Sequence, residues 1–420
     1  MPRTTPGGTC RTRSIGPVSG WVQPMRVLLI PNDFPTEQEP YRTYFNYLAA
    51  RELANLVDLR VLWLRAWLPG RKLVQTANIN GMPVITATGP IWPDREKLNL
   101  LFYHRFVWPF VSKYFQGIDL IHSVGVDFAG IIAGLWARKT RVHHVTQFIS
   151  DPSALKADFY ALPYARQLRQ HVQGVACNSK ALEQCARNLF PDLANIHAVY
   201  RGVDVSRFSP EGPTAGPLQD CPPTRFLFLG GLPSYPEREF DYNTKGGVTL
   251  MAAWRQAEDE LAARGAHLLF AGPAANNRMA QQWREGLKYP GRVFLSGEIK
   301  PETVPAYIRA ADVVLIPSMA EGLPNLALEA GACARPVFAS DIACNAEIVV
   351  PNDTGRLIPA GDVSAWQSVL MTYADAARRP ELREMGLRAR KRMTTGFDYR
   401  NYAPQMVQMY RQAMAYPLSQ

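Results

Sequence analysis

Short apolar runs alternate with helix-like segments along this chain, and the alternation occurs in two separate series. The first series starts at residues 26–30 and ends at 196–200, and the second starts at 225–229 and ends at 356–358. Residues 209–224 separate them and contain five prolines, which is typical of a linker. Strands alternating with helices form parallel sheets covered on both faces, and 420 residues favour two domains over one core. We therefore expect two doubly wound, Rossmann-like α/β domains.

Apolar periodicity and turn residues place the individual elements. The expected strands are 26–30, 58–64, 83–86, 119–122, 142–146, 174–178, 196–200, 225–229, 267–271, 293–295, 313–316, 336–339 and 356–358. The expected helices are 41–55, 100–115, 128–138, 180–189 with Asn178 and Ser179 as its cap, 247–263, 275–287, 301–310, one starting near Asn325, 366–377, 381–393 and 402–413. The predicted divisions of the chain are an extension at 1–24, an N-terminal domain at 25–208, the linker at 209–224, a C-terminal domain at 225–396 and a terminal segment at 397–420.

Composition narrows the class of protein only slightly. The net charge of +10 permits an anionic substrate, an anionic lipid surface or nucleic acid, and about a third of it lies in residues 1–24. Those residues have no apolar segment, so we expect no secretory signal but a disordered extension, or upstream sequence if translation starts at Met25. Six cysteines without a CxxC pair favour reduced thiols in the cytoplasm. No apolar run approaches the roughly 20 residues that span a bilayer.

The stretch from Leu315 to Glu329 is the strongest candidate for a site. An apolar strand ends at Pro317, and after a short loop a helix is expected to start with Asn325 as its N-cap. A helix N-terminus offers unpaired N–H groups and a partial positive charge, which suit a phosphate or another anion. Glu321 and Glu329 flank this terminus, where carboxylates are useful if they hold hydroxyl groups, as on a sugar or a ribose. The pattern predicts a ligand that carries both kinds of group.

This stretch resembles the signature of the family 4 glycosyltransferases, which have the two-domain GT-B fold. The matching segments are Ser318–Gly331, with Glu-Gly-Leu-Pro-Asn near its start, then Pro336-Val337, then Asn352-Asp-Thr-Gly355. Further landmarks are Cys177-Asn178-Ser179, Arg201-Gly202-Val203-Asp204, Thr244-Lys245-Gly246-Gly247 and the segment from Phe397 onward. The resemblance extends across the chain, with these landmarks in order.

The resemblance implies a hexosyltransferase that retains anomeric configuration, uses a UDP-, GDP- or ADP-sugar and needs no cofactor or metal. It places the sugar donor in the C-terminal domain and the acceptor mostly in the N-terminal domain, across a cleft, and it makes 397–420 a helix that crosses back. The acceptor would be a sugar or a lipid-linked group in polysaccharide, glycolipid or natural-product assembly. A nucleic acid partner is not expected.

The resemblance also implies a role for each matched residue. Glu321 would bind hydroxyls of the transferred sugar, Glu329 the nucleotide ribose, and Lys245 the pyrophosphate. The loop whose backbone N–H groups meet the sugar and pyrophosphate comprises Gly322, Leu323, Pro324 and Asn325. His122, at a strand end, has two interpretations: a structural hydrogen-bonding residue, which is favoured, or a catalytic group near the sugar.

The chain departs from the family pattern at three places. Family members follow the first strand of the C-terminal domain with Gly-Arg, whose arginine is a second cation on the phosphates. Here Gly230-Gly231 follows the strand, and we expect both glycines to line the donor site. Arg238, in the loop before Lys245, is a candidate substitute. The usual Gly-Gly loop after the first strand is replaced by residues 33–42, and Val124 stands where a second histidine is common. The alternatives to an active transferase are therefore a non-catalytic or slowed homologue that binds a nucleotide sugar or a partner protein and, more remotely, a nucleotide-sugar epimerase.

The aromatic segment at 100–115 also allows two interpretations. It contains seven aromatic residues together with Arg105 and Lys113, and Lys97 precedes it. Such a helix can dock peripherally on the inner face of a membrane. A helix that faces the core and has a basic rim is the favoured interpretation.

Overall fold

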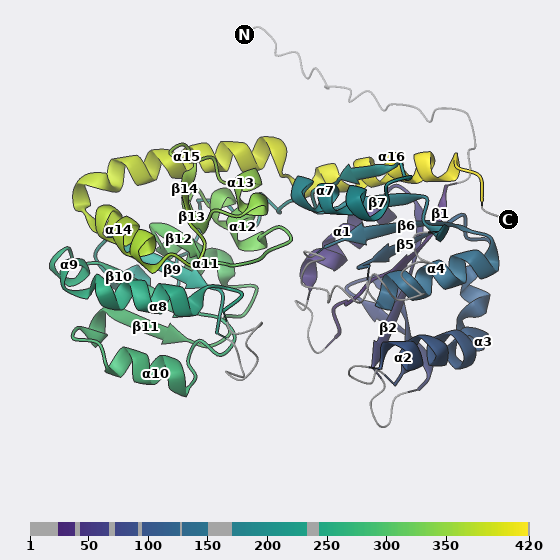
Figure 1. Cartoon of the computed structure of the whole chain (residues 1–420), viewed down its shortest axis with the longest axis horizontal. Coiled ribbons are helices and arrows are strands. Elements are labelled where there is room, and N and C mark those ends of the chain that lie inside the picture. Colours follow the sequence, from purple (N-terminus) through teal and green to yellow (C-terminus); the bar gives the residue numbers. More distant parts are fainter. Residues whose placement is uncertain are drawn as a thin grey trace, which may run out of the picture.

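The structure, a computed structural model, shows two α/β domains side by side (Figure 1). It describes residues 24–37, 43–66, 72–90, 95–126, 128–149, 170–232 and 243–418. All of the predicted extension except its last residue lies outside these ranges. Each domain has a sheet between layers of helices, so the expected fold class is confirmed.

The N-terminal domain, or N-domain, is built on an eight-stranded sheet with the order β3-β4-β2-β1-β5-β6-β7-β8. Its strands are β1 (Arg26–Ile30), β2 (Asp58–Ala66), β3 (Val74–Ile79), β4 (Met82–Gly89), β5 (Leu120–Val124), β6 (His143–Phe148), β7 (Gly174–Cys177) and β8 (Ile196–Ala198). Neighbouring strands are parallel except β3 and β4, which are antiparallel. The central strands are apolar on both sides because helices cover both faces of the sheet.

Strand β3 was not predicted. Its sequence, Val-Gln-Thr-Ala-Asn-Ile, mixes polar and apolar residues because β3 is a half-exposed edge strand. Asn80 and Gly81 follow it with φ angles of 49° and 87° and form the tight turn into β4. An Asn-Gly pair between two strand-like runs is a known hairpin signal, so this strand was predictable from the sequence.

Helices cover the N-domain sheet on its two sides (Figure 1). They are α1 (Tyr44–Ala54), α2 (Glu96–Phe102), the π-helix η1 (Tyr103–Val107), α3 (Trp108–Val111), the 3₁₀ helix η2 (Ser112–Phe115), α4 (Phe128–Thr140) and α7 (Lys180–Leu189). The run from α2 to η2 packs with α4 on one face of the sheet. On the other face α1 packs together with the C-terminal helix α16 (Tyr402–Met414). Ser179 caps α7 as expected, since its hydroxyl oxygen accepts a hydrogen bond from the Leu182 N–H at 3.1 Å.

The C-terminal domain, or C-domain, has a six-stranded parallel sheet with the order β11-β10-β9-β12-β13-β14. Its strands are β9 (Arg225–Leu229), β10 (His267–Ala271), β11 (Val293–Ser296), β12 (Val313–Ile316), β13 (Val337–Ser340) and β14 (Gly355–Ile358). Its helices are α8 (Gly247–Gln256), α9 (Glu258–Ala263), α10 (Arg278–Glu285), α11 (Val304–Ala310), α12 (Asn325–Ala332), α13 (Ala343–Ile348), α14 (Val363–Ala374) and α15 (Arg379–Gly396). A short 3₁₀ turn, η5 (Pro290–Arg292), precedes β11, and another, η6 (Ala376–Arg378), precedes α15. The six-residue helix α13 was not predicted, because it is shorter than a periodicity argument can detect.

The predicted linker is an ordered part of the C-domain surface. It contains the 3₁₀ turn η4 (Pro217–Asp220), whose Leu218 is buried in the C-domain core. Arg309 on α11 donates to the Pro213 carbonyl at 2.8 Å. Val203 and Phe208, which were assigned to the N-terminal domain, already pack into the same core. Proline content indicated an irregular segment correctly, but it carries no information about what that segment packs against.

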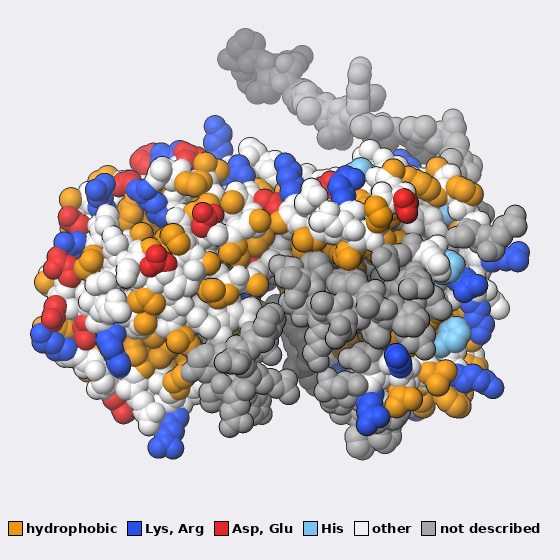
Figure 2. Space-filling model, in the orientation of Figure 1, with side chains coloured by type: hydrophobic (Ala, Val, Ile, Leu, Met, Phe, Trp, Pro, Cys, Tyr) orange, Lys and Arg blue, Asp and Glu red, His pale blue; other side chains and the backbone are white. Residues whose placement is uncertain are grey.

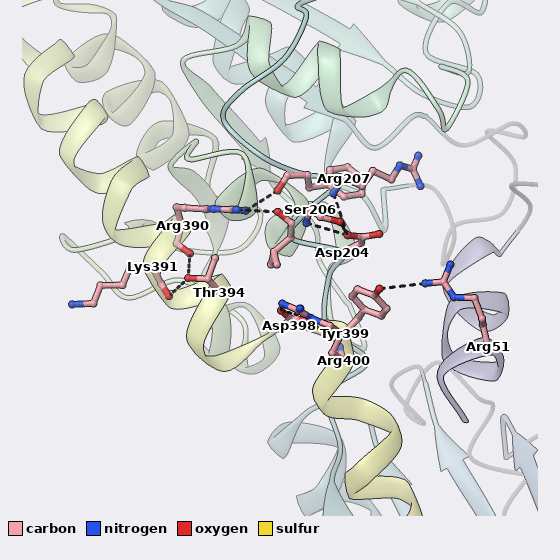
Figure 3. Close-up of polar contacts among 12 residues, drawn as sticks. Arg51, Asp204, Ser206, Arg207, Arg390, Lys391, Thr394, Asp398, Tyr399 and Arg400 are labelled. Atoms are coloured by element: carbon pink, nitrogen blue, oxygen red, sulfur yellow. Dashed lines mark hydrogen bonds and ion pairs between the residues drawn. The ribbon is translucent and has the colours of Figure 1, made fainter. Parts of the chain in front are cut away.

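The chain passes between the domains twice, and the two passages pair with each other through backbone hydrogen bonds. The Val203 N–H donates to the Phe397 carbonyl at 2.8 Å, and the Tyr399 N–H donates to the Val203 carbonyl at 3.1 Å. A 3₁₀ turn, η7 (Tyr399–Asn401), then leads from α15 into α16, which packs on the N-domain. In Figure 3, Arg51 of α1 reaches the Tyr399 hydroxyl, at 3.2 Å.

Candidate active site

Two loops at the carboxyl ends of β9 and β12 support each other in the C-domain. Gly246 has a φ of 72°, and a Cβ on it would lie 1.7 Å from the Pro317 carbonyl oxygen. The Met319 N–H donates to the Thr244 carbonyl at 2.8 Å. The turn before α8 therefore packs backbone to backbone on the loop after β12, and only glycine fits at the contact. This contact brings Lys245 beside Glu321.

Lys245 and Glu321 form an ion pair. The Lys245 Nζ lies 2.7 Å from the Glu321 Oε1, and the Ser318 hydroxyl donates to the same oxygen at 2.8 Å. The Glu321 side chain is 12% exposed, whereas that of Lys245 is 49% exposed. Among the residues described, none donates to the second carboxylate oxygen, Oε2. The carboxylate is therefore fixed in place, and the ammonium group is accessible from solvent.

A cavity of about 210 Å³ lies beside this pair. Its lining comprises Phe228, Leu229, Gly230, Lys245, Leu315, Ile316, Ser318, Glu321, Leu323, Pro324, Asn325 and Leu326. The structure thus brings together most residues that the sequence assigned to the sugar and the pyrophosphate. Gly322 is buried in the loop between Glu321 and Leu323.

The N-terminus of α12 faces this cavity, but the predicted cap was wrong. Asn325 is the first helical residue, and Pro324 occupies the N-cap position with φ −74° and ψ 108°. Proline has no side-chain acceptor, so no side chain caps α12. An uncapped N-terminus leaves N–H groups of the first turn available to a ligand, which favours anion binding more than the predicted cap would have.

A second cavity, of about 170 Å³, lies between the two domains and shares Asn325 with the first. Glu329 of α12 and Arg207 line it from the C-domain side, and Tyr44 and Phe45 of α1 line it from the N-domain. Burial raises the pKa of Glu329 to about 7, and the nearby Arg207 guanidinium opposes that shift. The two glutamates therefore serve two adjoining cavities, one on each side of the helix N-terminus.

Tight packing explains why glycine stands at position 231. Gly231 has a φ of 74°, and a Cβ there would lie 2.3 Å from the Pro273 carbonyl oxygen. The Leu232 N–H donates to that same oxygen at 2.8 Å, so the loops after β9 and β10 are held together. An arginine cannot occupy this place without moving one of the loops. The candidate substitute, Arg238, lies outside the described residues.

The structure does not bring His122 to either cavity. Its side chain is fully buried in β5, and its Nδ1 lies 2.7 Å from the Tyr410 hydroxyl of α16. Burial lowers the pKa of His122 to about 3, so the ring is neutral near pH 7. These contacts support the structural interpretation of His122 over the catalytic one.

Arg201 is a buried cation for which no separate role was predicted. It was named only as part of the motif Arg201-Gly202-Val203-Asp204. It is 7% exposed and donates to the Asn46 Oδ1 at 2.7 Å and the Gln147 Oε1 at 3.4 Å. Its guanidinium lies 5.1 Å from the centre of the Phe45 ring. Burial lowers the pKa of Arg201 to about 10. These partners come from α1 and β6, so no local sequence pattern signals the cluster.

Models of known protein families match both domains of this chain. A model of Glycosyltransferase Family 4 matches residues 43–207, and a model of glycosyl transferases group 1 matches residues 225–375. The D-inositol 3-phosphate glycosyltransferase of Xylanimonas cellulosilytica is 30% identical over 248 residues, which are 57% of this chain and 56% of that protein. The MMP alpha-(1->4)-mannosyltransferase of Mycolicibacterium hassiacum is 34% identical over 124 residues, 29% of this chain and 30% of that protein. The matches thus span about half the length of these curated relatives, or less.

Solved structures resemble the whole chain more evenly. Sucrose-phosphate synthase (tll1590) from Thermosynechococcus elongatus aligns with a TM-score of 0.68 and 22% identity, over 93% of this chain and 99% of that one. HepE from Anabaena, in complex with UDP and glucose, aligns with a TM-score of 0.67 and 14% identity, over 92% of this chain and 99% of that one. At identities this low, the structural similarity is evidence for the fold alone. It confirms the expected GT-B arrangement. Within the described ranges, no helix is both long and apolar enough to cross a membrane.

Proposed function

Because this chain belongs to the family 4 glycosyltransferases, we propose that it transfers a sugar from a nucleotide-sugar donor to an acceptor, with retention of anomeric configuration and without a metal. The acceptor is a sugar or lipid-linked group of a polysaccharide, a glycolipid or a natural product. The proposed compartment is the cytoplasm. UDP is the favoured nucleotide among UDP, GDP and ADP, since a structural neighbour with the same fold was solved with UDP and glucose.

One observation carries this proposal: a fixed carboxylate and an accessible ammonium group meet at the uncapped N-terminus of α12, inside a cavity. Glu321 Oε2 is available to accept hydrogen bonds from sugar hydroxyls, while Oε1 is held by Ser318 and Lys245. Without a ligand, Lys245 is paired with Glu321 at 2.7 Å. When the sugar donor binds, Lys245 turns to the pyrophosphate, and hydroxyl groups of the sugar take its place on the carboxylate.

The chemistry of the leaving group accounts for these residue types. Breaking the glycosidic bond leaves a nucleoside diphosphate that gains negative charge as it departs. Lys245 and the N–H groups of α12 are positioned to stabilise that charge without a metal, and one such contact contributes roughly 3–4 kcal/mol. The acceptor hydroxyl attacks from the face that the leaving group vacates and gives its proton to the departing diphosphate oxygen, so Glu321 positions the sugar and is not a nucleophile.

The second cavity holds the nucleoside in this proposal. Glu329 accepts hydrogen bonds from the ribose hydroxyls, and Arg207 and the aromatic Tyr44 and Phe45 enclose the same space. Because α1 contributes part of the lining, the N-domain takes part in closing the site around the sugar donor. The acceptor then enters from the N-domain side of the cleft.

Release of the nucleoside diphosphate tests the proposal. Purified protein is incubated with UDP-, GDP- and ADP-sugars and a broad set of acceptors, with and without EDTA. We expect release with one donor class, unchanged by EDTA. Glu321→Ala should lose transfer by at least about 100-fold while its thermal unfolding stays close to that of the wild type. An active Glu321→Ala protein would show that the sugar site lies elsewhere.

A homologue that binds a nucleotide sugar without efficient transfer is the second candidate. The packing at Gly231 favours it, because that packing excludes the second phosphate-binding cation. Calorimetric binding of a nucleotide sugar with no release of nucleoside diphosphate, for every donor and acceptor tested, would support this candidate and contradict the first. An epimerase is distinguished by conversion of the nucleotide sugar itself, which chromatography detects.

A further inference from the structure

The segment from α2 to η2 has two apolar faces. Packing in the core accounts for only one of them. Its inner face carries Leu100, Tyr103, Val107, Val111 and Phe115, which are buried against the sheet and α4. These residues recur every three or four positions, and the π-helix η1 keeps them in line with the core. The inner face agrees with the core-facing interpretation of this segment.

The outer face of the same segment is also apolar, and it lies in solvent. Leu98 is 47% exposed, Leu101 55%, Phe106 57% and Phe110 55%. Nine large apolar side chains are exposed in the described part of the chain, so nearly half of them lie on this one face. The Phe102 and Phe106 rings lie 5.2 Å apart, which makes the apolar surface continuous across η1. Contiguous exposed apolar side chains mark an interaction site more often than scattered ones do.

Exposed basic side chains accompany the apolar ones along this segment. Lys97, Arg105 and Lys113 are exposed, and none of them forms an ion pair with a carboxylate in the described ranges. Glu96, the first residue of α2, is the one acidic residue of this segment, and no Asp or Glu follows it before Asp119. Lys139 of α4 adds a further cation, with its Nζ 4.9 Å from the centre of the Trp108 ring. The face is therefore apolar at its centre and positive at its edge.

The position of this face in the molecule leaves it free to dock. In Figure 1, α2 and α3 lie at the lower end of the N-domain, whereas α16 and the passages between the domains lie at the upper side. Figure 2 shows hydrophobic side chains next to Lys and Arg in that lower region, with few acidic side chains nearby. A partner on this face would not press against the paired segments that join the domains.

We propose that the outer face of α2–η2 docks on the surface of an anionic phospholipid bilayer. Leu98, Leu101, Phe106 and Phe110 enter the boundary between headgroups and acyl chains, while the basic side chains bind phosphate groups at its edge. Charge decides between a membrane and a second copy of this chain: the basic edge matches anionic headgroups, and two copies of this face would repel each other. The inference does not depend on sugar transfer, because docking needs neither a sugar donor nor an acceptor.

Flotation of the full chain with vesicles tests this docking, without any sugar donor present. We expect binding to phosphatidylcholine vesicles that contain phosphatidylglycerol, and weak binding to phosphatidylcholine alone. Phe106→Ser with Phe110→Ser should weaken binding at least about tenfold, because both rings lose apolar contact. Arg105→Gln with Lys113→Gln should weaken binding by roughly 25-fold at low salt and remove the preference for anionic vesicles.

Leu387→Ser is the matched control, because Leu387 is 52% exposed on the basic helix α15 of the C-domain. It should leave vesicle binding unchanged. Absence of wild-type binding to anionic vesicles, or an equal loss in the control, would overturn the proposal. So would a wild-type dimer in gel filtration that the Phe106→Ser, Phe110→Ser variant converts to a monomer, since the face would then bind a second copy. Unchanged circular dichroism and thermal unfolding of each variant show that the fold is intact.

Discussion

At the scale of single residues, the site depends on which side chains the backbone can accommodate. Glycine at 246 permits the contact with Pro317 that places Lys245 beside Glu321. Glycine at 231 permits the contact with Pro273, and the same contact excludes the second cation that the family resemblance led us to expect here. In the proposed reaction, the charge on the leaving group is therefore met by one described lysine, Lys245, and by the N-terminus of α12.

Replacing Gly231 with arginine tests whether local packing excludes a large side chain at this position. Gly231→Arg should lower the midpoint of thermal unfolding and should not raise the rate of transfer, because a Cβ at this position would lie 2.3 Å from the Pro273 carbonyl oxygen. A residue other than glycine at a φ of 74° lowers the free energy of unfolding by about 1–2 kcal/mol, even without that clash. Calorimetry and the nucleotide-release assay measure the two effects. A stable, faster Gly231→Arg enzyme would mean that the loops after β9 and β10 separate easily.

The raised pKa of Glu329 predicts a pH dependence of stability. Its pKa is about 7 in the folded protein, against an ordinary value of 4.5. Between these values the unfolded chain loses the proton while the folded chain keeps it, so stability falls as pH rises through this window. Glu329→Gln should therefore gain stability relative to the wild type between about pH 5 and pH 7, as followed by urea unfolding at several pH values. A constant difference between the two proteins across this range would contradict the assignment.

The same group predicts a pH dependence of ligand binding. In the proposed site the ionised Glu329 carboxylate accepts hydrogen bonds from both ribose hydroxyls, so affinity for the nucleotide sugar should rise as pH increases through about 7. The Glu329→Gln variant should bind more weakly and without this rise. Isothermal titration on the acidic and the basic side of this pKa compares the two proteins, and a parallel rise in both would point to another titrating group.

At the scale of elements, one carboxylate of the C-domain caps a helix of the N-domain. Glu347 of α13 accepts hydrogen bonds from the N–H groups of Lys180 and Ala181, the first two residues of α7, each at 2.8 Å. The Tyr200 hydroxyl donates to the same carboxylate at 2.7 Å. A negative charge at a helix N-terminus is favourable, so this contact stabilises the approach of the two domains on that side.

Removing this carboxylate should loosen the contact between α13 and α7. Glu347→Gln should increase hydrogen exchange of the Lys180 and Ala181 amides and weaken the contact by about 1–2 kcal/mol. Ser179 still caps α7 from within the N-domain, so the helix itself should remain. Exchange measured by mass spectrometry reports the N-terminus of α7, and Glu384→Gln on α15 is the matched control. Equal exchange in both variants would show that the contact is weak in solution.

At the scale of the whole molecule, two passages of the chain join the domains and pair with each other through backbone hydrogen bonds. Arg390 of α15 donates to the carbonyls of Phe208 and Ala332, each at 2.7 Å, and of Val205, at 2.9 Å. Val203 pairs with the residues around Asp398. The first passage is thus tied to α15 and to the second passage at the edge of the C-domain, and Val203 and Phe208 of the first passage also line the cavity around Glu329 and Tyr44.

Gly202 is the tightest point of this pairing. It has a φ of 70°, and a Cβ on it would lie 2.5 Å from the Phe397 carbonyl oxygen. Gly202→Ala should therefore separate the two passages, lower the unfolding midpoint and enlarge the radius of gyration measured by X-ray scattering. Gly265→Ala is the control for left-handed backbone strain alone, because Gly265 has a φ of 73° and nothing within 4 Å of its Cβ position. If both variants scatter alike, the pairing does not set the distance between the domains.

The sequence by itself determined most of the elements and the centre of the site. Alternation of apolar runs and helical periodicity depends on neighbouring residues, so it predicted both sheets and missed short or polar elements such as β3 and α13. The loop from Pro317 to Glu329 is also local: a strand end, a turn and a helix start follow one another. Lys245 was assigned through the resemblance of Thr244-Lys245-Gly246-Gly247 to the family's phosphate loop. These predictions rest on contacts that each segment makes with itself.

Only the tertiary structure decided which side chains are buried, which are exposed and which reach the two cavities. His122 is buried because Tyr410, 288 residues away, covers it, and Arg201 is enclosed by side chains from α1 and β6. The exclusion of a side chain at Gly231 comes from Pro273, and the apolar outer face of α2–η2 is left in solvent because the core needs only the opposite face. Each outcome depends on which distant backbones lie within a few ångströms, and close packing sets that distance.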